Sequence, residues 1–198
     1  MSTNLFTTPQ ADEDATLTRL HHRLGRDADA DGLLDIAYRT IDTPVGTLLL
    51  AATTVGLIRV AYDVEDHAAV LAGLAQAVSP RILRAPARLD VAARQIQEYF
   101  AKRRTVFELP VDLRVADGFR RTVIEHLRDI GYGQRESYAA VAVAVGNPRA
   151  VRAVGSACAH NPLPVVIPCH RVVRSDGSTG QYVGGPAAKS ALLDLEAA

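Results

Sequence analysis

A proline-rich segment from Asn161 to Arg171 restricts the fold of this chain more than any other stretch. It reads Asn-Pro-Leu-Pro-Val-Val-Ile-Pro-Cys-His-Arg. Proline fixes its own φ angle and lacks a backbone N–H, so a helix is excluded here and a central strand is unfavourable. The sequence therefore predicts a stiff, extended connection with a buried apolar run, which carries the thiol of Cys169 to a fixed place.

The residues next to Cys169 give its thiol a chemical setting. His170 titrates near neutral pH and Arg171 is permanently charged, and a thiol beside such groups can become a thiolate nucleophile. A buried cysteine is more often a small apolar core residue, and neighbouring side chains on an extended chain point to opposite faces. We favour the chemical interpretation because core packing requires no thiol, imidazole and guanidinium within one rigid segment.

Composition indicates a globular protein of a reducing compartment. The chain has 198 residues, 48% of them hydrophobic and 22% charged, which allows one or two small domains. It has two cysteines, and we find no signal peptide and no long apolar run, so we expect a soluble, cytoplasmic protein without a membrane anchor. The net charge is zero, but residues 148–174 hold four arginines and no acid. This is either a modest nucleic-acid patch or an ordinary solvated face.

The first half of the chain is predicted to be an extension followed by an α/β scaffold. Residues 1–35 contain a helix over 14–26 and then a flexible acidic stretch, whose Asp spacing lacks the later ligands of a calcium loop. Residues 36–110 alternate between strand and helix patterns and carry no phosphate loop, carboxylate pair or metal cluster. We expect strands at 36–40, 46–52, 56–62 and around Leu83, and helices at 66–78 and 89–102, the latter with Val91, Ile96, Tyr99 and Phe100 inward.

Residues 111–198 are predicted to be mainly helical. Helices over 119–130, 137–145 and 147–160 are followed by a last helix over 186–196. Asn147 is a good N-cap and Pro148 a good first helical residue, so the second and third helices have the form of a helix-turn-helix. The third helix is rich in small residues and projects Arg149 and Arg152, although a small-residue helix can equally be a buried one.

The run Pro168-Cys-His-Arg-Val172 resembles the active-site signature of the O6-alkylguanine-DNA alkyltransferases. The resemblance covers residues 36–198. It implies an α+β two-domain fold, with a ribonuclease H-like scaffold at 36–110 and a winged helix-turn-helix-like domain at 111–198. It also implies stoichiometric, suicidal transfer of an alkyl group from O6-alkylguanine, and from O4-alkylthymine, to the cysteine. Further residues follow the family order: Arg152-Ala-Val-Gly, Asn161-Pro162, Ser175-Asp-Gly, Tyr182, Gly184-Gly185, Lys189 and Leu192-Leu193.

The resemblance assigns roles to individual residues. Cys169 is the nucleophile, His170 its base through a bridging water, and Glu196 the group that orients the imidazole; alone, Glu196 would read as a surface carboxylate. Tyr138 supports the flipped nucleotide and donates toward guanine N3, and Arg152 fills the space left in the stack. The other expected DNA or base contacts are Tyr182, Val183, Val172, Ser175 and Arg149, and the supporting residues are Asn161, Arg171 and Lys189.

The expected partner is double-stranded DNA containing O6-alkylguanine, bound through the minor groove by a monomer, with cooperativity left open. We expect no cofactor, because the lesion is the alkyl donor. We also expect no metal, because residues 1–157 contain no cysteine and their histidines lack ligand spacing. Three alternatives remain: a lesion sensor without transfer, a cysteine hydrolase, and an additional transcriptional role, for which the chain shows no extra domain.

Overall fold

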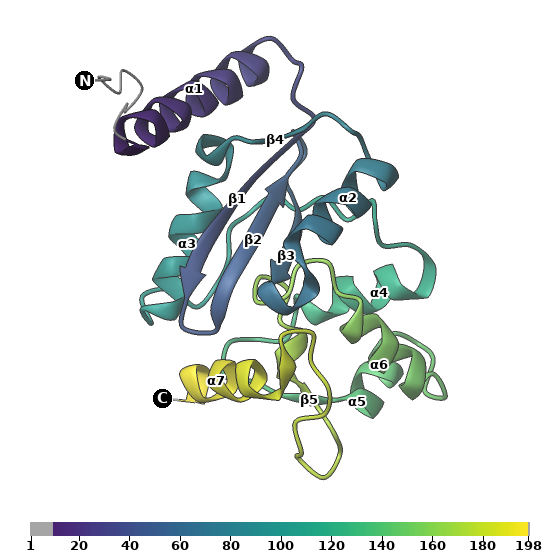
Figure 1. Cartoon of the computed structure of the whole chain (residues 1–198). Coiled ribbons are helices and arrows are strands. Elements are labelled where there is room, and N and C mark those ends of the chain that lie inside the picture. The colour runs from purple at the N-terminus through teal and green to yellow at the C-terminus, as the bar shows by residue number, and fades with distance from the viewer. Residues whose placement is uncertain (1–9, 198) are drawn as a thin grey trace, which may run out of the picture.

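A four-stranded sheet organises the N-terminal half of the chain in the computed structural model, which describes residues 10–197. The strand order is β3-β2-β1-β4, and all neighbours are antiparallel except β1 and β4, which are parallel. Figure 1 shows helices on both sides of this sheet. The strands are β1 (Ile36–Thr43), β2 (Gly46–Ala52), β3 (Leu57–Tyr62) and β4 (Ile82–Arg84).

Alternation along the strands gives the sheet two buried faces. Leu48 and Leu50 point to the face covered by α3 (Asp90–Phe100), and Ala51 points to the face covered by α2 (His67–Ala77). The predicted strands and helices of this region are present within a few residues. One detail was wrong: Val91 was predicted to point inward, but it is 48% exposed, because α3 turns Ala92, Ile96 and Tyr99 toward the sheet.

Helix α1 (Gln10–Ala30) is longer than predicted and continues through the acidic stretch that was expected to be flexible. The helix ends at Ala30 and is followed by Gly32, whose φ of 67° is a left-handed conformation typical of the residues that follow a helix C-terminus. Arg88 pairs with Asp29 in this last part, and Gly25 packs on the backbone of β4. The earlier part of α1 projects from the sheet and leaves its leucines half exposed.

Three short helices and a terminal helix build the C-terminal half. Two very short parallel strands, β5 (Glu136–Ser137) and β6 (Val172–Val173), join the start of α5 to the end of the proline-rich segment. No helix within residues 10–197 is long and apolar enough to cross a membrane. The helices are α4 (Gly118–Leu127), α5 (Tyr138–Ala144), α6 (Val151–Ala159) and α7 (Gly185–Ala197), and the 3-10 helices of the chain are η1 (Asp63–Glu65), η2 (Pro86–Leu89) and η3 (Cys169–Arg171).

The prediction that the third helix begins at Pro148 was wrong by one turn. Helix α6 begins at Val151, and the Ala150 N–H donates to the carbonyl of Asn147 at 2.9 Å, which makes residues 147–150 a turn. Asn147 closes α5 by donating its N–H to the Ala142 carbonyl at 2.9 Å, whereas the N-cap position of α6 is Ala150, which has no side-chain cap. The helix-turn-helix arrangement itself is present, with α6 packed on α4 and α5.

The proline-rich segment is folded into turns, so the prediction of an extended connection was wrong. The Ile167 N–H donates to the Leu163 carbonyl at 2.7 Å, and Val165 adopts a positive φ of 73°. The segment then ends in η3, which begins at Cys169. Prolines exclude regular helix and sheet, but they are compatible with turns, which the pattern of three prolines did not distinguish from an extended chain.

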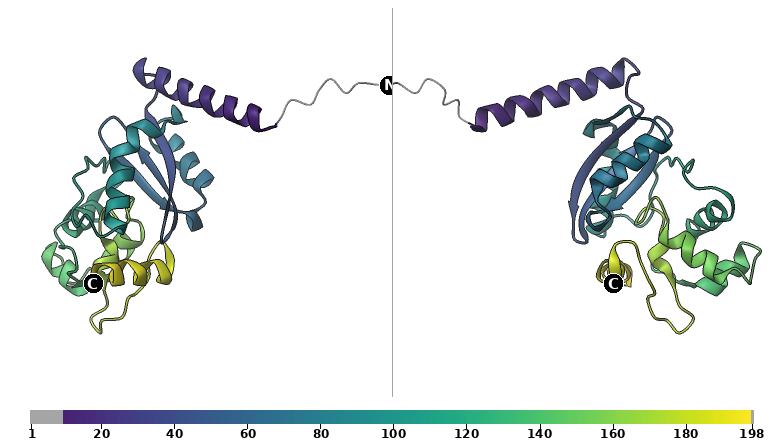
Figure 2. Two further views of the ribbon diagram at one scale, coloured as in Figure 1. Left: turned by 90° about the vertical axis from the view of Figure 1, so that its left-hand side faces the viewer. Right: turned by 45° about the vertical axis from the view of Figure 1, so that its right-hand side comes forward.

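The β3 edge of the sheet is covered by Pro110, which comes just before the C-terminal half, and by the proline-rich segment. Val60 on β3 donates its N–H to the Pro162 carbonyl at 2.8 Å, and Leu57 donates to the Pro110 carbonyl at 2.9 Å. An uncovered edge strand is a template for aggregation, so this contact protects the sheet while fixing the start of the proline-rich segment. Both views in Figure 2 place α1 and the loop of residues 174–184 at opposite ends of the molecule.

Candidate active site

Cys169 lies at the first position of η3, buried to 2% exposure in the main hydrophobic core. The turn before it is braced by Asn161, which is fully buried at the end of α6. The Asn161 side chain accepts a hydrogen bond from the Leu163 N–H at 3.0 Å and donates one to the Ile167 carbonyl at 2.8 Å. One amide group therefore closes both sides of the turn that presents the thiol.

The Glu196 carboxylate on α7 is buried and collects donors from several parts of the chain. Its Oε1 accepts from His170 Nε2 at 2.9 Å, and Arg171 binds both oxygens, through Nε at 2.9 Å and Nη2 at 2.8 Å. The Tyr99 hydroxyl also donates to Oε1 at 2.7 Å, and the Gly133 N–H to Oε2 at 3.1 Å. A buried carboxylate is stable only when its oxygens are this fully satisfied.

The charge states of this network follow from burial and contacts. Burial by itself would raise the pKa of Glu196, but the hydrogen bonds from His170 and Arg171 hold that pKa far below its usual range. Burial lowers the pKa of His170, and the bond to Glu196 opposes this only in part, so the imidazole is neutral at pH 7. Its Nε2 proton donates to Glu196, which leaves Nδ1 unprotonated and without a partner among the described residues.

The thiol of Cys169 is held in its protonated form. Burial raises the pKa of Cys169 to about 11, while the nearby Asn161 amide and the positive charge of Lys189 act in the opposite direction. Lys189 on α7 is fully buried and donates to the Val172 carbonyl at 2.6 Å. The site therefore contains a cation near the thiol but does not ionise it unaided.

Two tyrosines line the loop of residues 174–184, which we call the active-site loop. Tyr138, the first residue of α5, lies against Gly180, where an added Cβ would come within 2.9 Å of the Tyr138 hydroxyl. The Lys189 ammonium lies 5.8 Å from the centre of the Tyr138 ring, and burial raises the pKa of that tyrosine to about 12. The ring of Tyr182, on the loop, packs edge-on to His170 at 6.3 Å between centres.

The other predicted contact residues divide into exposed and buried ones. Arg149, Arg152 and Ser175 are exposed, the first two around the start of α6 and the third in the turn after β6. Val183 is half-buried against the core, and Val172 is fully buried, with only its carbonyl engaged by Lys189. The side chain of Val172 therefore faces the core in this structure.

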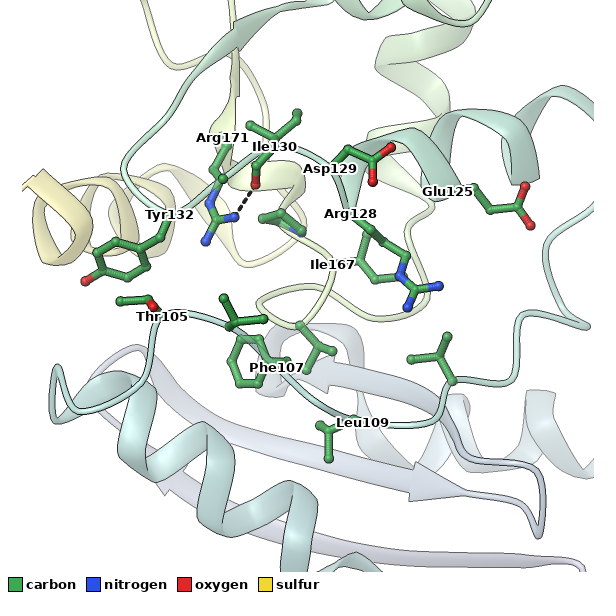
Figure 3. Close-up of a pocket in the computed structure, with 15 residues that line it drawn as sticks. Thr105, Phe107, Leu109, Glu125, Arg128, Asp129, Ile130, Tyr132, Ile167 and Arg171 are labelled. Atoms are coloured by element: carbon green, nitrogen blue, oxygen red, sulfur yellow. Dashed lines mark hydrogen bonds between the residues drawn. The ribbon is translucent and has the colours of Figure 1, made fainter.

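A cavity of about 360 Å³ lies between the two halves, against Val166, Ile167 and Pro168 of the proline-rich segment. Figure 3 shows Phe107 and Leu109 on one wall and Arg171 on the opposite side, where its guanidinium bonds to the Ile130 carbonyl. Neither Cys169 nor any residue of the active-site loop lines this cavity. It is therefore separate from the thiol.

Two residues of the site come from the N-terminal half and were not predicted to belong to it. Tyr99 was predicted only as an inward residue of its helix, and Tyr62 only as the end of a strand. The Tyr62 hydroxyl lies 3.1 Å from that of Tyr182, and Tyr99 bonds to Glu196. Both contacts join residues about a hundred positions apart, so no local pattern could have revealed them.

The histidine, cysteine and acidic side chains outside the thiol site can be described by their grouping. Among residues 10–197 no three histidine, cysteine or acidic side chains are grouped so that they could hold a metal ion. Cys158 and Cys169 are both buried free thiols.

The fold and site together define a class: a helix-turn-helix protein that carries a buried thiol next to an imidazole–carboxylate pair. Family models for the 6-O-methylguanine DNA methyltransferases match both halves, the ribonuclease-like domain at residues 36–113 and the DNA binding domain at residues 118–198. The chain belongs to the methylated-DNA-protein-cysteine methyltransferase family.

Individual relatives show how closely the chain follows this family. A protein of that name from Mycobacterium tuberculosis is 38% identical over 167 residues, covering 81% of this chain and 92% of the relative. The protein of the same name from Homo sapiens is 35% identical, covering 79% of this chain and 78% of the relative. The crystal structure of Mycobacterium tuberculosis OGT in complex with DNA matches with a TM-score of 0.70 at 37% identity, covering 81% of this chain and 92% of that one. The predicted family and α+β two-domain fold are thus confirmed.

Proposed function

We propose that this chain repairs DNA by moving the alkyl group of O6-alkylguanine, and of O4-alkylthymine, onto Cys169. The sulfur–carbon bond forms as the carbon–O6 bond breaks, and guanine leaves after gaining a proton. The product is a thioether, which has no hydrolysable acyl bond, so each chain acts once and needs no cofactor. The observation that carries the proposal is the buried contact of His170 with Glu196 beside the thiol, in a family whose members are named for transfer to cysteine.

His170 is the base in this proposal. With a thiol pKa of about 11, ionisation at pH 7 without help would cost about 5 kcal/mol. The neutral imidazole can take the proton at Nδ1, through a bridging water, because Nε2 is engaged by Glu196. The Glu196 carboxylate then stabilises the imidazolium that forms, as the third member of a triad does. Asn161, Arg171 and Lys189 support this arrangement from the core.

The substrate in this proposal is duplex DNA bound through the minor groove by α6. The O6 substituent is out of reach inside a duplex, so the nucleotide must rotate out of the stack. Arg152 fills the vacated space, while Tyr138 donates toward guanine N3 and stabilises the leaving base. Tyr182 packs on the base, and Val183 offers a backbone N–H to O6. Minor-groove readout is nearly blind to sequence, which suits a repair protein.

Arg149 and Ser175 contact DNA beside α6. Val172 supports the site from the core, because its carbonyl accepts the hydrogen bond from Lys189. We place the protein in the cytoplasm as a monomer, since two buried free thiols suit a reducing compartment.

Intact-protein mass spectrometry tests the transfer. The chain is incubated with an oligonucleotide duplex containing O6-methylguanine, beside Cys169→Ser. We expect the wild type to gain one methyl group, about 14 Da from the chemistry, located on the Cys169 peptide, and the variant to gain nothing. Tight lesion binding without any mass gain would contradict the proposal and favour a sensor. Repeated turnover of an ester or amide would favour a hydrolase.

A further inference from the structure

Tyr62 ends β3, the strand whose edge contacts the C-terminal half. It is 2% exposed and belongs to the same core cluster as Cys169. Its backbone is fixed by an N–H bond to the Glu65 carboxylate at 2.8 Å, and Glu65 is itself paired with Arg59. The position of the Tyr62 ring is therefore set by the sheet.

The hydroxyl of Tyr62 meets the active-site loop. It lies 3.1 Å from the Tyr182 hydroxyl, and the two rings pack edge to face at 5.7 Å between centres and 76° between planes. Burial raises the pKa of both tyrosines, so both hydroxyls stay protonated and one donates to the other. This is a side-chain hydrogen bond from the N-terminal half to the residue of the loop that packs on His170.

The loop backbone is shaped to the Tyr62 ring. A Cβ added at Gly184 would lie 2.6 Å from Cζ of Tyr62, so only glycine lets the chain pass this close to the ring. The other end of the loop is exposed from Arg174 to Ser178. Tyr62 thus holds the inner end of a loop whose outer end faces solvent.

Tyr182 is therefore in contact with both His170 and Tyr62. A ring that must pack on an extruded base is useful only if it already stands in place, because ordering a loop during capture costs conformational entropy. The sheet holds the loop in place through Tyr62, whose ring packs against Gly184 and whose hydroxyl bonds to Tyr182.

We propose that Tyr62 is a positioning residue for alkyl transfer, which fixes Tyr182 and the active-site loop so that the flipped base enters a preformed site. The inference rests on the proposed function and deepens it, because it gives the N-terminal half a direct part in base capture. It requires that the Tyr62 hydroxyl act through Tyr182 and not through DNA binding.

Single-turnover kinetics of Tyr62→Phe test this. The variant keeps the ring against Gly184 and loses only the hydroxyl. We expect the transfer rate at saturating duplex to fall about three- to tenfold, the size of one net hydrogen bond, while the affinity for the duplex stays unchanged. Reaction with free O6-benzylguanine should fall at least as much, because the free base has no DNA contacts to hold it. Hydrogen exchange of residues 178–184 should become faster.

A double-mutant cycle separates this role from a general structural one. Tyr182→Phe removes the same hydrogen bond from the other side, so Tyr62→Phe combined with Tyr182→Phe should be no slower than Tyr182→Phe alone. Tyr38→Phe is the matched control, a tyrosine of the same sheet that packs in a different cluster, and should change nothing. Additive losses in the double variant would overturn the inference, as would an unchanged rate in Tyr62→Phe.

The two proposals fail in different ways. If the wild type transfers no alkyl group, the proposed function is wrong, and the positioning role is then judged by hydrogen exchange of the loop alone. If the wild type transfers normally and Tyr62→Phe matches it in rate and exchange, only the positioning role is wrong.

Discussion

At the scale of single residues, the site assigns protection of the thiol and acceptance of its proton to different groups. Burial protects Cys169 but keeps its thiol protonated, with a pKa of about 11. The neutral His170 next to it is held by Glu196 in the tautomer whose free nitrogen can accept a proton. In the proposed mechanism, the thiol therefore stays protonated until a substrate is in place and ionises only as the reaction proceeds.

The pH dependence of His170→Gln follows from this arrangement. At pH 7 we expect the transfer rate to fall by about 10²- to 10⁴-fold, the usual contribution of a positioned base. The thiol pKa is raised, so without the base the thiolate fraction grows about tenfold for each pH unit up to about pH 11. The deficit of the variant should therefore shrink as the pH rises, which single-turnover rates between pH 6 and 10 will measure.

The matched control for this experiment is His126→Gln. His126 also contacts a carboxylate, that of Glu136 at 2.9 Å, but it lies on α4 outside the thiol site. Its rate should equal that of the wild type at every pH. A His170→Gln deficit that stays constant up to pH 10 would show that the imidazole has a structural role and does not accept the proton.

Residue-level prediction from sequence succeeds where the information is local. His170 and Arg171 follow Cys169 directly in the sequence, so their closeness was predictable. Glu196 on the terminal helix was predicted only from the family resemblance. Tyr99 and Tyr62 were not identified because their contacts span 97 and 120 positions, and a tyrosine in a helix or strand reads simply as core. Such contacts exist only once the two halves have packed together.

At the scale of elements, the periodic segments were predictable and their ends less so. Strands β1 to β3 follow clear strand and turn patterns. Helix α6 begins at Val151 after a turn over residues 147–150, and the Asn147-Pro148 pattern did not distinguish that turn from the first turn of a helix. In the proline-rich segment, the prolines exclude a helix and a sheet strand but do not determine which turn forms. That turn depends on the Asn161 side chain and on the positive φ of Val165.

Arg152→Ala tests the role proposed for α6. Arg152 is exposed on that helix, which packs on α4 and α5, so its removal should leave the thiol site intact. We expect slower transfer from O6-methylguanine in duplex DNA, by about tenfold or more, because the space left by the flipped base is no longer filled. Reaction with free O6-benzylguanine should be unchanged. Equal losses on both substrates would contradict the intercalating role and indicate damage to the site.

At the scale of the whole molecule, the N-terminal half is more than a scaffold. The edge of its sheet pairs with the proline-rich segment of the C-terminal half. Its Tyr99 hydroxyl donates to the Glu196 carboxylate, which also binds His170 and Arg171. A buried carboxylate shared by both halves should couple their stability. We therefore expect the two halves to unfold in one transition, with Glu196 as the strongest single link.

Glu196→Gln tests this coupling through the pH dependence of stability. Removing one member of a buried ion pair costs about 3 to 5 kcal/mol, because Arg171 is left buried without its partner. The pKa of Glu196 is lowered on folding, so its stabilisation is complete above the ordinary carboxyl pKa of about 4.3 and is lost as the pH falls further. In urea unfolding, the difference between the free energies of unfolding of wild type and variant should be constant from pH 7 to 5 and shrink at pH 4 and 3.

Glu125→Gln, which breaks an exposed pair with Arg121 on α4, should lower the free energy of unfolding by less than about 1 kcal/mol and provides the control. A difference between wild type and Glu196→Gln that is independent of pH would mean that the carboxylate charge does not hold the halves together, whereas two separate transitions in the wild type would disprove the coupling itself.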